Sequence, residues 1–167
     1  MSERRRELVR RLAEAVRGPE DRDEGLYLPG WELSDWEVLL SDADIIQFQD
    51  GDIVLRKGDS GSNLYFLVLG KLEVSVPQAG SISISPVISI EPGSVVGEIA
   101  FLDEHGRSAS VWSRGRSELL RLRRETFNEL KLTNPALICD LLQAIGRIVA
   151  QRMRKRISAA GQGTYGD

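Results

Sequence analysis

The sequence has a single cysteine and a single histidine, and these two shortages argue against several classes of protein. One cysteine, Cys139, cannot form an internal disulfide, which fits a reducing compartment. A catalytic zinc site needs two or three histidine ligands and a cupin-type metal site needs several, so His105 alone argues against both. Haem and iron–sulfur sensors are disfavoured on the same count. His105 lies in a short polar stretch and is expected to be a solvated loop residue rather than a catalytic base.

Long apolar runs and an excess of basic charge are also missing. No segment approaches the roughly 20 apolar residues that span a bilayer, and the N-terminus lacks the apolar core of a secretory signal. The net charge of -3 gives no sign of a nucleic-acid or membrane-surface protein. The 167 residues, 41% hydrophobic and 28% charged, have the composition of one ordinary globular domain. We therefore expect a cytoplasmic protein that does not contact membranes.

Apolar residues with helical spacing begin the chain. Residues 3–17 place their apolar side chains on one stripe, and a Gly-Pro pair follows as a stop signal. Ser34 and Glu37 have the spacing of a capping box and predict a short second helix. We expect residues 1–32 to form an N-terminal helix and linker ahead of the main domain.

Helical spacing returns after residue 123. One helix is expected up to about residue 132 and a longer one over 135–157, where cations near its C-terminal end suit the helix dipole. Cys139 has apolar neighbours in the longer helix and is expected to pack. Residues 158–167 are predicted to be a disordered tail.

Strand-like patterns occupy the middle of the chain. A continuous apolar run covers 64–69, alternation covers 72–76 and 82–90, and glycine-containing turns separate these segments. Pro86 suggests an edge position or a bulge. Many short strands joined by tight turns are typical of an antiparallel barrel. The predicted fold class is α+β: an antiparallel β-roll, of the jelly-roll barrel kind, with flanking N- and C-terminal helices.

The most informative segment is GEIAFLDEHGRSASV, residues 97–111. Gly97 permits close approach of a ligand to the backbone, and the helical turn after it offers unpaired N–H groups to an anion. Arg107 can return over the same spot and pair with an anion through two parallel hydrogen bonds, with Ser108 as a neutral donor. Glu98 would repel a phosphate, so it is expected to accept from a sugar hydroxyl or to balance Arg107. Together these residues suit a ligand with one negative charge and a vicinal hydroxyl.

This segment resembles the phosphate-binding cassette of the cyclic nucleotide-binding domain family, found in catabolite activator proteins, protein kinase A regulatory subunits and cyclic-nucleotide-gated channels. In that cassette an arginine commonly follows the glutamate by nine or ten positions, and Glu98 and Arg107 are nine apart (98 to 107). The opening strands of the family resemble FQDGDIVLRKGDSGSNLYFLVLGKLEV, which begins at Phe48. The resemblance covers residues 33–157, which we expect to form the nucleotide-binding domain with its C-terminal helix.

The resemblance implies a role for each cassette residue. Glu98 would contact the ribose 2′-hydroxyl, Arg107 would pair with the exocyclic oxygens of the cyclic phosphate, and Ser108 would assist it. The implied ligand-binding residues are Gly97, Glu98, Ile99, Ala100, Arg107, Ser108 and Ala109. Two positions depart from the family pattern: Val96 stands where an aromatic or another apolar residue is usual, and Gly106 replaces a common proline. A flexible glycine there predicts a less pre-organised loop and a weaker affinity.

These roles have structural alternatives. Arg107 and Glu98 could form an ion pair without any ligand, and Glu98 could be a carboxylate favoured at a helix start. In the family the last helix often closes over the purine, which makes Arg147, Gln151 and Arg152 candidates for base contacts or stacking; a solvated polar face is the alternative. Ser108 matches cAMP-responsive relatives, so cAMP is favoured over cGMP. No metal and no further cofactor is expected.

The resemblance also implies how such a domain acts, because the family couples ligand binding to movement of the final helices. Only about ten residues follow Ile157 in this sequence, so no DNA-binding domain is expected, and no catalytic motif is present. We expect a stand-alone sensor or a fragment of a longer protein, with a protein partner or self-association as its output. The apolar stripe of the C-terminal helix could support a homodimer, or it could equally cover the barrel. We therefore predict a non-enzymatic cyclic nucleotide sensor. Two alternatives stay open: a degenerate domain of the same fold that acts as an interaction module without nucleotide, and a metalloenzyme of the cupin kind.

Overall fold

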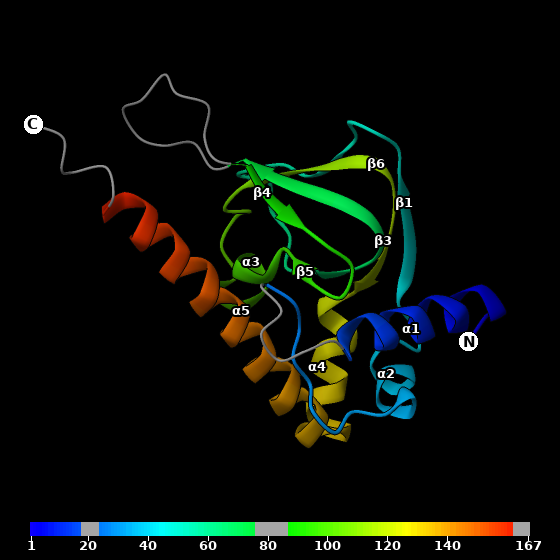
Figure 1. The fold of residues 1–167 in the computed structure, drawn as a ribbon. Coiled ribbons are helices and arrows are strands. Elements are labelled where there is room, and N and C mark those ends of the chain that lie inside the picture. The colour runs from blue at the N-terminus through cyan, green and yellow to red at the C-terminus, as the bar shows by residue number, and fades with distance from the viewer. Residues whose placement is uncertain (18–23, 76–86, 162–167) are drawn as a thin grey trace, which may run out of the picture.

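Six strands form one antiparallel sheet that is rolled up, and helices from both ends of the chain lie against it (Figure 1). The computed structural model describes residues 1–17, 24–75 and 87–161. The helices are α1 (Glu3–Val16), α2 (Leu33–Leu39), α3 (Glu98–Asp103), α4 (Arg124–Thr133) and α5 (Pro135–Gly161). The strands are β1 (Asp44–Phe48), β2 (Ile53–Leu55), β3 (Leu64–Ser75), β4 (Val87–Ile90), β5 (Val95–Val96) and β6 (Ser110–Leu122). The predicted α+β roll is confirmed, although its described strands do not close into a barrel.

The two longest strands, β3 and β6, form the middle of the sheet. They pair from Leu64 opposite Leu122 to Ser75 opposite Ser110. The sheet order is β1-β6-β3-β4, with β2 also paired to β6 and β5 also paired to β3. Strand alternation sends one set of apolar side chains to the inside of the roll. These are Leu55, Leu67, Leu72, Ile90, Val96, Val111 and Leu119.

A second, larger core lies between the roll and the helices. The apolar stripe predicted for the first helix is buried there: Leu8, Val9, Leu12, Ala13 and Val16. Trp36 of α2 meets Phe66 of β3 edge-on, with ring centroids 6.1 Å apart. Helices α1, α2 and α4 gather at one end of the roll, whereas α5 runs along its side (Figure 1). This arrangement brings the C-terminal half of α5 next to the corner between β5 and α3.

The segment before α2 is attached to the turn between β4 and β5. The Leu26 N–H donates to Gly93 O at 2.9 Å, and the Ser94 hydroxyl donates to Glu24 O. Glu24 has a left-handed backbone, with φ of 62°, and is only 6% exposed. Because β5 leads directly into α3, these contacts place an N-terminal carboxylate beside the start of α3.

The ends of two helices differ from the sequence-based predictions. The capping box of α2 uses Glu32 and Asp35, with the Glu32 N–H donating to Asp35 Oδ2 at 2.8 Å, so the predicted Ser34–Glu37 box is wrong. The α5 helix continues to Gly161, because the Ser-Ala-Ala sequence after Ile157 sustains a helix and glycine ends it. The tail predicted over 158–167 is therefore helical as far as residue 161.

Cys139 and the segment that precedes β4 also differ from, or lie outside, the sequence-based predictions. Cys139 is exposed rather than packed, because it lies on the outer face of α5. The predicted strand residues 82–86, with Pro86, lie outside the described residues, as do residues 162–167. Cys139 is therefore a free thiol on the surface of the longest helix.

Gly70 marks an irregularity in β3 where only glycine fits. Its φ is 89°, and a β-carbon there would collide with Arg116 O and lie 2.6 Å from Ser117 Oγ. Gly115 has a φ of 72°, but no atom lies within 4 Å of its β-carbon position. We predict that Gly115→Ala lowers the free energy of unfolding by about 1–2 kcal/mol through backbone strain. Gly70→Ala should lower it by about 1–3 kcal/mol more, through overpacking. Denaturant unfolding measures both variants, and equal losses would contradict the steric argument.

Candidate functional site

The candidate site is built where β5 turns into α3. Gly97 caps α3 with a φ of 82°, and a β-carbon at this position would collide with the guanidinium of Arg107. Glycine is required here both for the left-handed backbone and for the close approach of the arginine. The helix that follows leaves its first N–H groups without intrahelical acceptors beside that arginine. The corner therefore presents backbone donors and a cation together.

Arg107 is a buried cation whose direct partners, among the described residues, are neutral. It is 5% exposed, and its Nη1 and Nη2 donate to Gly97 O at 3.0 Å and to Asn63 O at 3.1 Å. Its guanidinium lies over the Tyr65 ring, 5.6 Å from the centroid. Burial lowers the pKa of the Arg107 guanidinium, and the nearby Tyr65 and Glu98 oppose that shift. An arginine stays protonated in a protein, so the site holds a positive charge that no described carboxylate contacts.

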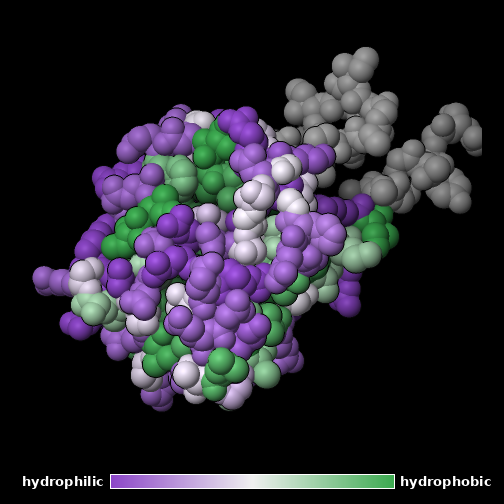
Figure 2. All heavy atoms as spheres, turned by 180° about the vertical axis from the view of Figure 1, so that it is seen from behind, coloured by the Kyte–Doolittle hydropathy of each residue, from purple (hydrophilic) through white to green (hydrophobic). Residues whose placement is uncertain are grey.

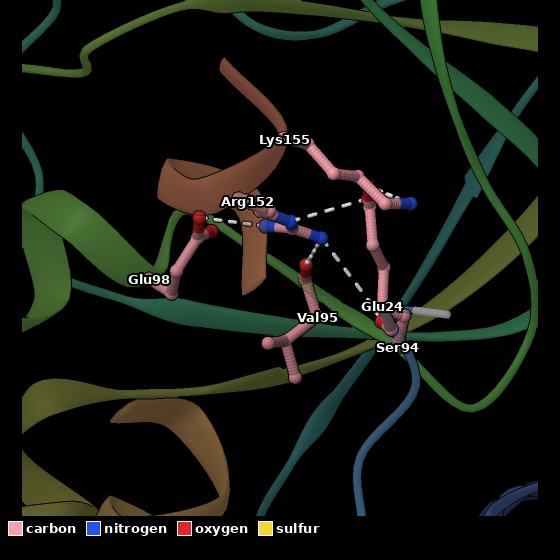
Figure 3. Close-up of polar contacts among 6 residues, drawn as sticks. All are labelled: Glu24, Ser94, Val95, Glu98, Arg152 and Lys155. Atoms are coloured by element: carbon pink, nitrogen blue, oxygen red, sulfur yellow. Dashed lines mark hydrogen bonds and ion pairs between the residues drawn. The ribbon is translucent and has the colours of Figure 1, made fainter. Parts of the chain in front are cut away.

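Glu98, the first residue of α3, contacts an arginine of α5 instead of Arg107 (Figure 3). Arg152 Nη1 lies 2.6 Å from Glu98 Oε1, and both residues are buried. The same guanidinium reaches Val95 O at 3.1 Å, Ser94 Oγ at 3.4 Å and Glu24 Oε2 at 3.4 Å. Lys155 Nζ lies 3.2 Å from Glu24 Oε1. The alternative Arg107–Glu98 ion pair is therefore not formed. We call Glu24, Ser94, Val95, Glu98, Arg152 and Lys155 the Arg152 cluster.

Arg107, Glu98 and Arg152 all line one pocket at the mouth of the roll. All seven predicted ligand-binding residues, 97–100 and 107–109, line it. Its apolar wall comes from the inside of the roll, including Leu55, Ile90 and Val111, and its other side is formed by Arg152 and Arg156 of α5. The pocket thus offers an uncompensated cation, a carboxylate and an apolar surface within one cavity.

Of the three residues predicted for base contact, Arg152 alone lines this pocket. Arg147 lies over the Tyr27 ring, 4.6 Å from its centroid, and lines a separate groove between α5 and residues 27–31. Gln151 is half-buried and does not line the pocket. Residues 147 and 151 share one side of α5, whereas residue 152 is rotated by about 100° from 151. The structure therefore does not support base contacts for Arg147 or Gln151.

Several residues in and around the site were missed in the sequence, among them Asn63, Tyr65 and Glu24. Asn63 and Tyr65 support Arg107, through a backbone carbonyl and an aromatic ring. Asn63 could have been noticed in the sequence, because it is a polar residue directly before the apolar run 64–69. Glu24 lies next to a run of charged residues and carried no signal, because nothing local distinguishes it from a solvated linker residue.

Residues 1–17, 24–75 and 87–161 are the part of the chain that the structure describes. No group of three or more His, Cys, Asp or Glu side chains there could hold a metal ion. In the same ranges no helix combines the length and apolarity needed to cross a bilayer. His105 is exposed in the loop after α3, as expected.

Comparison with known proteins agrees with this geometry. The family model for the cyclic nucleotide-binding domain matches residues 45–134, more than half of the chain. The chain belongs to the cyclic nucleotide-binding domain family. Over 98 residues it is 41% identical to a cAMP-dependent protein kinase regulatory subunit of Dictyostelium discoideum, an alignment that covers 56% of this chain and 29% of that protein. The chain thus spans less than a third of the length of this relative.

Solved structures share the fold. A cyclic nucleotide-binding domain from Methylobacillus flagellatus KT superposes with a TM-score of 0.80 at 20% identity, over 97% of this chain and 87% of that chain. The catabolite activator protein of Thermus thermophilus gives 0.64 at 25% identity, over 81% and 61%. The regulatory domain of Toxoplasma gondii PKA, crystallised with cAMP, gives 0.58 at 26% identity, over 77% and 45%. Glu24 and Arg152 lie outside the segment that the family model matches.

Removal of the shared guanidinium would leave two buried carboxylates without their common partner. We predict that Arg152→Met lowers the free energy of unfolding by about 3–5 kcal/mol. Arg10→Met is the control, because Arg10 is 51% exposed and pairs with Glu7 on its own helix; its change should stay within about 0.5 kcal/mol. Urea unfolding without nucleotide measures both variants. A similar small change in the two would show that the Arg152 cluster contributes little to stability.

Proposed function

We propose that this chain is a non-enzymatic sensor domain that binds a cyclic nucleotide, with cAMP preferred to cGMP. Arg107 carries the proposal, because its buried guanidinium is held by two backbone carbonyls and is contacted by no described carboxylate. A buried charge without a counter-charge is costly, so an anion at this point is strongly favoured. Two of the five guanidinium N–H groups serve the carbonyls, which leaves donors for the two exocyclic oxygens of a cyclic phosphate.

The rest of the pocket supports the same ligand. The backbone from Gly97 to Ala100 would add N–H donors to the phosphate, and the exposed Ser108 would add a hydroxyl beside Ala109. Glu98 would accept a hydrogen bond from the ribose 2′-hydroxyl. The apolar wall of the roll would cover the uncharged parts of the ligand, and Arg152 would lie at the side of the base. One charge, one hydroxyl acceptor and an apolar wall fit a nucleoside cyclic phosphate.

The preference for cAMP has two supports. The family resemblance favours cAMP at a site with Ser108, and the similar proteins include a cAMP-dependent kinase regulatory subunit and a domain crystallised with cAMP. The similarity to a kinase regulatory subunit also supports a regulatory role rather than a catalytic one. The ligand would act through a protein partner or self-association, in the cytoplasm. The alternative is an interaction module of the same fold that binds no nucleotide.

Thermal unfolding with cAMP, cGMP and 5′-AMP tests this proposal. A ligand at 100 times its Kd stabilises the folded state by about 2.7 kcal/mol, so cAMP should raise Tm most and 5′-AMP least. Arg107→Ala should abolish the shift. Arg114→Ala is the control, because Arg114 is 58% exposed in a pair with Glu73, away from the pocket, and should keep the shift. Absence of a shift with every cyclic nucleotide would favour the interaction module.

The outer face of α5 favours self-association as the output. Uncharged residues recur there at alternating intervals of three and four, and all are exposed: Ala136, Cys139, Gln143, Gly146, Ala150, Met153 and Ile157. Gln143, Gly146 and Ala150 also line the groove beside residues 27–31, so this groove borders the proposed seam. Such spacing is typical of the seam between two helices, and small residues allow a close approach. The last turns of α5 extend beyond the roll (Figure 1), and Figure 2 shows hydrophobic atoms at that end. The partner that matches this spacing is α5 of a second copy.

Sedimentation over a range of protein concentrations tests this dimer. The wild type should dimerise, and Ala150→Glu combined with Met153→Glu should make it monomeric, because buried carboxylates would face each other in the seam. Arg154→Glu makes the same change in net charge at an exposed position off the seam and should leave the dimer intact. A wild type that stays monomeric at every concentration would refute self-association.

A further inference from the structure

Glu24 lies outside the segment that the family model matches, yet its carboxylate belongs to the polar network of the pocket (Figure 3). It is as buried as Glu98, at 6% exposure. Its backbone is attached to the β4–β5 turn, because Ser94 Oγ donates to Glu24 O and the Leu26 N–H donates to Gly93 O. An N-terminal carboxylate is therefore built into the wall behind the site.

Arg152 depends on two carboxylates for its position. Its Nε points to Glu24 Oε2 at 3.4 Å, and its Nη1 points to Glu98 Oε1 at 2.6 Å. Val95 O and Ser94 Oγ accept from Nη2 at 3.1 Å and 3.4 Å. Contacts to all three nitrogens restrain a long side chain that otherwise has many rotamers. Without Glu24, Nε would lose its carboxylate and the guanidinium could rotate away from Glu98.

The orientation of the Glu98 carboxylate matters because it must accept hydrogen bonds from both Arg152 and the proposed sugar hydroxyl. Its Oε1 accepts from Arg152, and a carboxylate has a second oxygen that can accept from a hydroxyl. The charge of Arg152 also offsets the repulsion between Glu98 and a cyclic phosphate. A Glu98 carboxylate that lost Arg152 would hold a sugar hydroxyl poorly, whereas the contact of Arg107 with phosphate would persist.

We propose that Glu24 is a positioning residue of the nucleotide site: through Arg152 it fixes the Glu98 carboxylate for the sugar hydroxyl. The N-terminal segment thereby sets how strongly the site selects a ligand with a 2′-hydroxyl. This proposal rests on the proposed function, since it concerns the same ligand. By linkage, a nucleotide in the pocket should in turn strengthen the attachment of residues 24–26. Lys155 is 48% exposed, so its pair with Glu24 is weakened by solvent and is secondary.

Calorimetric binding of cAMP and of 2′-deoxy-cAMP tests the proposal. The wild type should prefer cAMP, and Glu24→Gln should weaken cAMP binding about fivefold or more while 2′-deoxy-cAMP changes little. In the Arg152→Met background, Glu24→Gln should not weaken cAMP further, because the connection is already lost. Glu37→Gln is the control, since Glu37 is 37% exposed and pairs with Arg6 away from the pocket.

Several outcomes would overturn the proposal. Equal weakening of both ligands would show that Glu24 acts through general stability, and an unchanged preference would show that it does not act on the site. Hydrogen exchange without nucleotide gives an independent readout: Glu24→Gln, unlike Glu37→Gln, should speed exchange at the start of α3 and around residue 152. Unchanged exchange refutes the positioning role whatever the ligand. If the wild type binds neither nucleotide, the proposed function fails and the exchange result decides on Glu24 alone.

Discussion

The guanidinium of Arg152 joins three segments that are far apart in the sequence: residue 24, the corner at residues 94–98, and helix α5. Two carboxylates as buried as Glu24 and Glu98 are stable inside the protein only with a cation between them. Because Ser94, Val95 and Glu98 belong to one short stretch, the same contacts also fix the corner from which α3 starts. The shape of the ligand pocket therefore depends on an ion-pair cluster that lies behind it.

Arg107 and Arg152 show two different reasons for burying an arginine. Arg152 is neutralised by acceptors from three elements, so it requires nothing more from outside the chain. Arg107 is held by carbonyl oxygens, which fix its direction but leave its charge uncompensated. A neutralised guanidinium stabilises the fold, whereas an uncompensated one makes the folded state more stable once an anion is bound. That difference, rather than burial itself, is the reason for proposing Arg107 as the binding residue and Arg152 as the structural one.

Local patterns predicted much of the fold and the loop residues that line one side of the pocket. The apolar stripe of α1, the roll and the residues 97–109 were predictable because each is encoded within a few turns or strands. The partner of Glu98 was not, because Arg152 lies 54 positions away and its direction depends on the rotation of α5 against the roll. The same rotation turned Arg147 and Gln151 away from the pocket. The burial of Glu24 could not be predicted from the sequence, because it follows from contacts of residues 24–26 with residues 93 and 94.

The two sides of the pocket come from different parts of the chain. One side is therefore suited to binding the ligand, and the other to changing when α5 or residue 24 moves. The proposed phosphate side is encoded in one continuous motif, whereas the proposed sugar side is held by residue 24 and helix α5. A ligand shifts a conformational equilibrium only through contacts that differ between the states, and the Arg152 contacts change whenever α5 or residue 24 moves. Met153, on the outer face of α5, directly follows Arg152. A second helix packed on that face would therefore restrain the same turn that holds Glu98, so self-association and nucleotide affinity should be coupled through one residue.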